Sequence, residues 1–155
     1  SGAKSMPMAY NNTANPFYSQ ADRTFTVGQD WTWGGSKTLV LFFCGAPANT
    51  GGQLYVEVNG VKIPYGGDPA NINRPWWTPW EIDLASPGVP DLHNVTSLSI
   101  GVEGAGTSGT LYIDDICLYA TAPASERVVA WLEAESATSI TEPMRSPYSA
   151  PKPPV

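Results

Sequence analysis

The sequence predicts an all-β domain, an antiparallel β-sandwich of the jelly-roll type with about eight strands. Short runs with alternating or continuous apolar residues recur at regular spacing, with turn residues between them. The 15 glycines and 15 prolines favour frequent turns over long helices. With 155 residues, the chain has room for one domain and little more.

The expected strands follow one another along the chain, separated by turns and two long loops. They cover residues 4–10, 18–26, 38–44, 53–58, 61–64, 80–84, 97–102 and 109–119. The run 38–44 is apolar on both faces, which is typical of a central strand of a sandwich. Asn59-Gly60 stands between two apolar runs and predicts a tight hairpin, because both residues tolerate positive φ. Trp31 and Trp33 have the same parity, and we expect both to pack inward.

The composition changes after Tyr119. Residues 1–119 are therefore assigned to the jelly-roll module, 120–127 to a linker of small residues, and 128–155 to a strand-capable segment with a proline-rich tail. Within this last part, Ser125 could cap a helix with an apolar stripe. Residues 129–134 could equally form a strand.

Charge and residue counts exclude several classes of protein. Eight basic and fourteen acidic residues give a net charge of −6, whereas binding to a nucleic-acid backbone needs a basic face. No apolar run approaches the ~20 residues of a membrane-spanning helix, so we expect no membrane insertion. One histidine and two cysteines are too few for a zinc site. Cys44 and Cys117 could form a disulfide or remain two buried thiols.

An aromatic cluster in and just after one long loop is a candidate for ligand binding. Its members are Tyr65, Trp76, Trp77 and Trp80, with Asn71, Asn73 and Arg74 between them. Sugars offer apolar C–H faces to aromatic rings, and amide or guanidinium groups can bind their hydroxyls. Trp80 is expected in the core, and Trp77 could cover the core as a lid. Trp76 is the leading platform for a ligand, supported by Trp77, Tyr65, Asn71 and Arg74.

Asp114 and Asp115 interrupt the apolar run 109–119. Adjacent strand residues point to opposite faces, so this pair is not expected to act on one substrate. An inward carboxylate at a strand end would suit Ca²⁺, which prefers oxygen ligands. The alternative is that one aspartate caps a loop and the other is solvated.

An enzyme is not expected. His93 lies near Asp91, but no recognisable nucleophile motif accompanies them. Several acidic residues could in principle form the carboxylate pair of a hydrolase, namely Glu57, Glu81, Asp83 and Glu103. Acidic residues on strands ordinarily just face the solvent, and this explains these four without a catalytic role.

Residues 4–119 resemble the galactose-binding-type jelly-roll modules of large secreted bacterial proteins, especially those of planctomycetes and their relatives. The matching segments are 4–8, 10–12, 21–25, 30–32, 77–84 and 109–119. The resemblance implies a non-catalytic, extracellular module, secreted or at the cell surface, that binds a glycan or polysaccharide or acts in adhesion. Such modules often hold one structural calcium near the last strand, where Asp114 and Asp115 match.

The chain departs from this pattern at both ends. A strand or two usually precedes the segment that begins at Lys4. Residues 131–144 look like the opening of a second module, whose glutamates, here Glu133 and Glu135, lie near a calcium site in that family. The alternative function is therefore a structural surface or filament subunit. In it, the C-terminal segment completes the sheet edge of its own molecule or of a neighbour.

Overall fold

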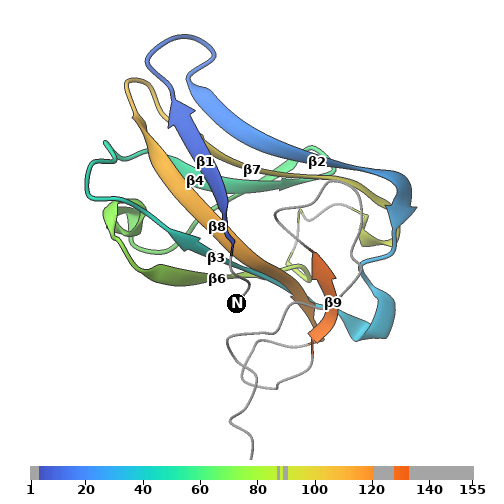
Figure 1. The fold of residues 1–155 in the computed structure, drawn as a ribbon. Coiled ribbons are helices and arrows are strands. Elements are labelled where there is room, and N and C mark those ends of the chain that lie inside the picture. Colours follow the sequence, from blue (N-terminus) through green and yellow to red (C-terminus); the bar gives the residue numbers. More distant parts are fainter. Residues whose placement is uncertain (1–3, 87, 89–90, 121–127, 133–155) are drawn as a thin grey trace, which may run out of the picture.

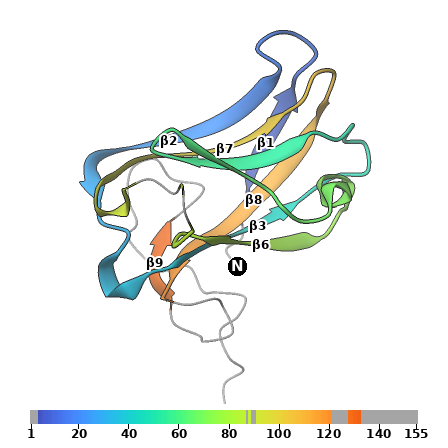
Figure 2. The same ribbon diagram turned by 180° about the vertical axis from the view of Figure 1, so that it is seen from behind.

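The computed structural model describes residues 4–86, 88, 91–120 and 128–132, which form two antiparallel sheets packed face to face (Figure 1). Sheet A has the order β1-β8-β3-β6, and sheet B has the order β2-β7-β4-β5. Figure 2 shows the same two layers from behind. The strands are β1 (Met6–Asn11), β2 (Tyr18–Gln29), β3 (Thr38–Cys44), β4 (Gln53–Val58), β5 (Val61–Pro64), β6 (Trp77–Asp83), β7 (Val95–Glu103) and β8 (Ser108–Tyr119). The predicted jelly-roll β-sandwich is thereby confirmed.

The core lies between the sheets and is built from alternate residues of each strand. In β3, Leu39, Leu41 and Phe43 point inward and are fully buried. Their neighbours Val40 and Phe42 lie on the outer face of sheet A, where they form a second buried cluster with Cys117 and Tyr119. This explains why the 38–44 run is apolar on both faces.

Local backbone geometry accounts for the hairpin and for the wrong prediction about Trp33. Asn59 and Gly60 join β4 to β5 with φ values of 47° and 81°, as the Asn-Gly pair predicts. Trp31 is buried against Phe25 in an edge-to-face contact, as expected. The expectation that Trp33 also packs inward is wrong, since it is 70% exposed. The 3₁₀ turn η1 (Trp33–Gly35) begins at this residue and ends the two-residue alternation.

The C-terminal segment forms a strand, β9 (Val128–Leu132), and not a helix. It pairs antiparallel with residues 116–119 of β8 in the same molecule, while β1 pairs with residues 108–113. Because β3 pairs with the other edge of β8, β1 and β9 share one edge end to end. The predicted linker beyond Ala120, Glu133, Glu135 and the proline-rich tail lie outside the described residues.

Within the described part of the chain, no helix is long and apolar enough to cross a membrane.

Two further 3₁₀ turns connect strands, η2 (Pro69–Asn73) between β5 and β6 and η3 (Leu92–Asn94) before β7. Most of the predicted ligand-binding residues lie in or next to η2.

Candidate functional site

Asn49 fixes the η2 loop to the end of sheet A. Its buried side-chain Nδ2 donates to the carbonyl oxygens of Ile72 at 2.7 Å and Thr110 at 2.9 Å. The N–H of Thr110 donates to Asn49 Oδ1 at 2.8 Å. One side chain thus joins η2 to β8, and the loop can present its other residues in a defined position.

The loop joins three of the predicted site residues by hydrogen bonds and brings a fourth, Trp76, against one of them. Asn71 Nδ2 donates to the Tyr65 hydroxyl at 2.8 Å, and Arg74 donates to Asn71 Oδ1 at 2.5 Å. Arg74 also pairs with Asp68 at 2.8 Å. Its guanidinium carbon lies 5.5 Å from the centre of the Trp76 ring. This cation–π contact favours one position of Trp76, which is 55% exposed.

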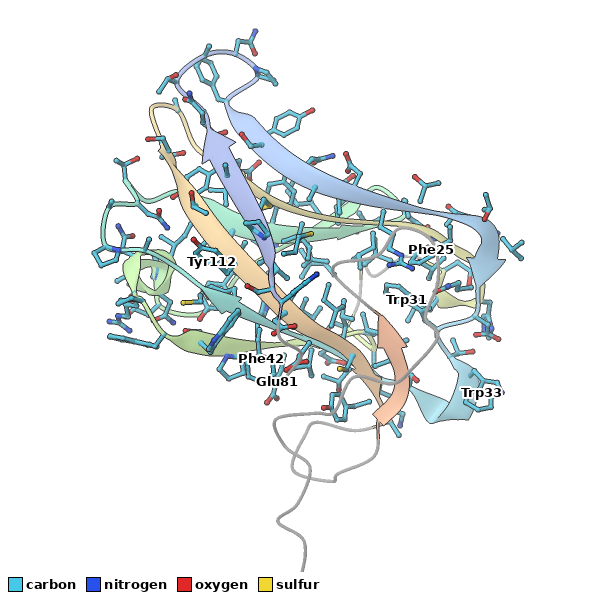
Figure 3. The ribbon with its side chains drawn as sticks, viewed as in Figure 1. Phe25, Trp31, Trp33, Phe42, Glu81 and Tyr112 are labelled. Atoms are coloured by element: carbon cyan, nitrogen blue, oxygen red, sulfur yellow. The ribbon has the colours of Figure 1, made fainter. Side chains whose placement is uncertain are left out.

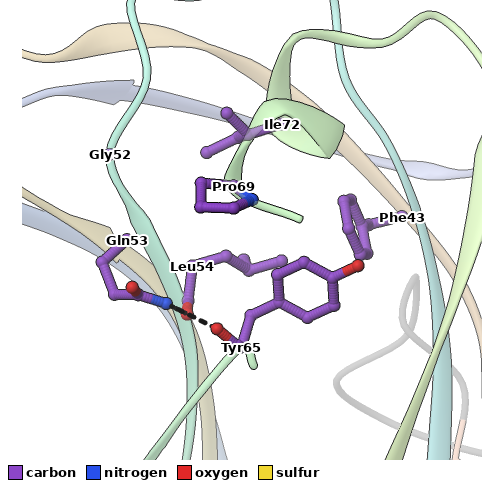
Figure 4. Close-up of a pocket in the computed structure, with 7 residues that line it drawn as sticks. All are labelled: Phe43, Gly52, Gln53, Leu54, Tyr65, Pro69 and Ile72. Atoms are coloured by element: carbon purple, nitrogen blue, oxygen red, sulfur yellow. Dashed lines mark hydrogen bonds between the residues drawn. The ribbon is translucent and has the colours of Figure 1, made fainter. Parts of the chain in front are cut away.

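Tyr65 does not offer its ring as a platform. The ring makes edge-to-face contacts with Phe43 at 5.1 Å and with the buried Trp80 at 5.2 Å between centres. A small depression opens beside it, with Leu54 and Ile72 in its wall (Figure 4). Its empty volume of about 250 Å³ includes open solvent, and ligand pockets usually enclose about 300–1,000 Å³. The depression is too small to hold a sugar chain.

Trp77 lies apart from this loop cluster, on the outer face of sheet A. There it shares a row with Tyr112, a residue that the sequence analysis does not single out. Cys44 of β3 pairs with Trp77 of β6 on one side and with Tyr112 of β8 on the other. Residues directly opposite in antiparallel strands share a face, and Trp77 is 46% exposed and Tyr112 40%. We call these three residues the outer row. Nothing in the sequence gives the strand register, although the alternation around Leu111 and Ile113 marks Tyr112 as outward-facing.

The next rows of this face are less open. Asp114, Phe42 and Pro79 lie opposite one another, and Val40 lies opposite Glu81. Figure 3 shows Tyr112, Phe42 and Glu81 over the strands of sheet A. Phe42 is buried, whereas Glu81 is exposed at the β6 edge. The accessible part of the face is therefore the outer row and the adjoining edge of β6.

A bulge in β8 changes the position of the two aspartates. Phe42 pairs with Asp114 and Val40 with Cys117, so β8 carries one extra residue there. Asp115 lies in this bulge with φ of 48°, and its N–H donates to Asp114 Oδ1 at 2.9 Å. The expectation of strict alternation through this pair is wrong, and the alternative of a solvated aspartate fails because both residues are buried.

The described side chains do not make up a complete calcium site. Burial, and then the negative charge of Asp114, raise the pKa of Asp115 above its ordinary value. A cation would relieve that repulsion, but Ca²⁺ takes about six to eight oxygen ligands. Among the described residues, no group of three or more His, Cys, Asp or Glu side chains could hold a metal. Calcium at Asp114 and Asp115 stays a prediction, and the melting temperature in Ca²⁺ and in EDTA would test it.

We expect Asp115→Asn, measured in EDTA, to raise the free energy of unfolding at neutral pH, with a gain that shrinks toward pH 4. The raised pKa means that the folded state holds this proton more tightly than the unfolded chain, whose ordinary value is 3.8. Wild-type stability therefore falls as pH rises from about 4 through the folded pKa. Asparagine removes the titration and tolerates positive φ. Urea unfolding of both proteins at several pH values is the measurement, and a difference independent of pH would contradict the expectation.

Of the two alternatives for Cys44 and Cys117, the disulfide is not formed. Both residues are free thiols, with Cys117 buried and Cys44 partly buried. Cys117 pairs with Val40, four residues before Cys44 on β3. Four residues of strand span about 13 Å, and a disulfide needs Cα atoms within about 7 Å. Burial raises the pKa of both thiols, which keeps them protonated.

Comparison with known proteins supports the fold. No family model and no curated protein matches the chain. Part of an exo-β-agarase structure matches with 17% identity and a TM-score of 0.62, covering 77% of this chain and 20% of the agarase. The chain thus spans about a fifth of that enzyme.

Two carbohydrate-binding modules also align, more distantly. The family 11 module from Clostridium thermocellum has 16% identity, a TM-score of 0.48 and coverage of 72% of this chain and 73% of the module. CBM28, a module specific for non-crystalline cellulose, has 11% identity and a TM-score of 0.42, covering 74% of this chain and 73% of the module.

Proposed function

We propose that this protein is a non-catalytic carbohydrate-binding module that binds a polysaccharide or glycan at the outer row. The observation that carries the proposal is the placement of Trp77 and Tyr112, two exposed aromatic residues on either side of Cys44. Two strand spacings separate them by about 10 Å. Two rings on one sheet face can contact successive parts of an extended chain.

The surroundings supply the polar groups that such a ligand needs. Trp76 adjoins Trp77 in the sequence, and Arg74 stacks on its ring. Glu81 is exposed at the same edge of β6 and can accept hydrogen bonds from hydroxyls. Aromatic rings give apolar contact area to the C–H faces of a sugar, while a few polar groups fix its orientation.

The likeness to part of an agarase agrees with this role, because an agarase by its name acts on a polysaccharide. We further propose that the module works outside the cell, secreted or on the cell surface, where such ligands occur. Adhesion to a glycan-coated surface would use the same site.

The test is a glycan array probed with the purified chain in Ca²⁺ and in EDTA, followed by titration of any glycan that binds. We expect Trp77→Ala and Tyr112→Ala each to weaken binding about tenfold, or about 1.4 kcal/mol. Trp76→Ala should weaken it as well. Trp33→Ala is the matched control, because it also removes an exposed tryptophan. Trp33 lies before the start of β3, whereas the outer row lies at the end of β3 (Figure 3).

A folded protein that binds no glycan would overturn the proposal. Binding that Trp33→Ala weakens as much as Trp77→Ala would overturn the assigned surface.

A structural role is the second candidate, and the position of β9 favours it. This strand fills part of the edge of β8 that β1 leaves open. The same segment of another copy could pair there and link molecules into a filament. Light scattering over a range of concentrations tests this role, and a monomer at the highest concentration would contradict it.

A further inference from the structure

The outer face of sheet B contains a tyrosine that lies flat on the sheet. Tyr55 of β4 pairs with Gly101 of β7, which pairs with Gln20 of β2. A Cβ atom built on Gly101 would lie 2.4 Å from both Cζ and Oη of Tyr55. The phenol therefore crosses over Gly101, and its hydroxyl donates to Gln20 Oε1 at 2.8 Å. Side chains on a sheet normally stand roughly perpendicular to it, so this ring presents its face outward.

A lysine lies over that ring. The Lys62 ammonium lies 4.2 Å from the centre of the Tyr55 ring and pairs with Glu103. Tyr55 is 1% exposed, and Pro64 of β5 lies opposite it on the other side from Gly101. Both partners of the ion pair are partly exposed, and such pairs contribute about 0–1 kcal/mol. The ion pair with Glu103 therefore adds little to the cation–π contact that keeps Lys62 over the ring.

Hydrogen-bonding groups surround the ring on the same face. Gln20 Nε2 donates to Asp22 Oδ1 at 2.8 Å, and the Ser99 hydroxyl donates to the same oxygen at 2.6 Å. Tyr18, which is exposed, pairs with Glu103 two residues further along β2 and β7, and therefore on the same face as Gln20 and Gly101. Burial, and then the charges of Glu103 and Glu57, raise the pKa of Tyr55 to about 12, so its hydroxyl remains a donor.

We propose that this outer face of sheet B is a second carbohydrate-binding surface, with Tyr55 as its stacking platform and Lys62 as a cover that the sugar displaces. The sugar would lie on the Tyr55 ring, and its hydroxyls would replace Lys62 as donors to Glu103. The rim carries three acidic side chains, Asp22, Glu57 and Glu103, together with Lys62. This balance favours a neutral sugar chain over an anionic one. With the outer row on sheet A, the module would have two sites on opposite faces and could link two chains.

The experiment separates the two surfaces by removing the first. In the double variant Trp77→Ala/Tyr112→Ala, amide shifts are followed by NMR during titration with neutral hexasaccharides of cellulose, laminarin and agarose. We expect the amides of Gln20, Ser99 and Gly101 to shift. Lys62→Ala in that background should tighten binding about threefold or more, because it uncovers the ring. Lys37→Ala, which removes an exposed lysine elsewhere, is the control and should change nothing.

A further variant tests the platform itself. Tyr55→Leu in the same background should abolish the shifts, and its unfolding curve shows whether the fold is kept. Tyr55→Phe preserves the ring and should retain binding even if the leucine variant fails to fold.

Each outcome decides between the two proposals. Shifts confined to the outer row in the wild type, and lost in the double variant, would overturn the second surface and support the first. Shifts confined to sheet B would support the second surface and overturn the outer row as the binding site. No shift with any of the three sugars in the wild type would overturn both.

Discussion

Replacing Asn49 by alanine is expected to lower the free energy of unfolding by about 3 kcal/mol. The substitution removes three hydrogen bonds, two to the carbonyl oxygens of Ile72 and Thr110 and one from the Thr110 N–H. Asn49 is 5% exposed, so water cannot easily replace them. Each lost bond costs about 1 kcal/mol, and a buried group left unsatisfied costs more.

Urea unfolding of the wild type and of Asn49→Ala is the measurement. Asn71→Ala is the matched control, because it removes the same type of side chain from the η2 loop but lies in a partly exposed position. We expect the control to lose about 1 kcal/mol. Equal losses in the two variants would show that the Asn49 side chain does not fix the loop to β8.

The sequence predicted strand positions well, because alternation and turn chemistry are local. The bounds of β3, β4 and β5 follow from the 38–44 run and from the Asn59-Gly60 turn. The start of β6 at Trp77 was missed, since Pro79 and the preceding tryptophans read as loop. Trp77 belongs to the strand because it pairs with Cys44, which is a long-range contact.

The same distinction explains the outcome at the candidate site. Tyr65, Asn71, Arg74 and Trp76 lie together, as their closeness in sequence suggests, whereas Trp77 lies apart from them in the outer row. Their role in ligand binding stays a prediction. Tyr112 was missed because its place beside Cys44 depends on strand register, which one sequence does not reveal. The bulge at Asp115 was missed for a related reason, since alternation on one strand cannot show an inserted residue.

Gly101 shows how a single residue can carry information that becomes visible only in the fold. In the sequence it is a glycine within a strand, which indicates a bulge or the close approach of another group. The structure shows the second of these, with the Tyr55 ring in the space that a Cβ atom would occupy. The platform on sheet B therefore depends on a contact between Tyr55 of β4 and Gly101 of β7. These residues are 46 positions apart in the sequence, so the pattern of neighbouring residues could not predict the contact.

Replacing Gly45 by alanine should destabilise the protein by about 3 kcal/mol and also weaken glycan binding at the outer row. A Cβ atom at this position would lie 2.0 Å from the Ile72 carbonyl oxygen and 2.5 Å from its carbonyl carbon. These are backbone atoms of η2 that cannot rotate away, and overpacking of this kind typically costs about 1–3 kcal/mol. The Gly45 N–H also donates to the Arg74 carbonyl at 2.9 Å, so the strain reaches the residue that holds Trp76.

Gly66→Ala is the control for this prediction, because no atom lies within 4 Å of a Cβ built there and its φ is not positive. It should leave both the unfolding midpoint and glycan affinity unchanged. Loss of stability in Gly45→Ala with unchanged affinity would mean that Trp76 and its loop do not contribute to the site and that Trp77 and Tyr112 suffice. Unchanged stability would mean that η2 can move away from β3. In that case Asn49 would not hold the loop rigidly either, so the two glycine variants and the Asn49 variant together test whether η2 is a fixed part of the binding surface.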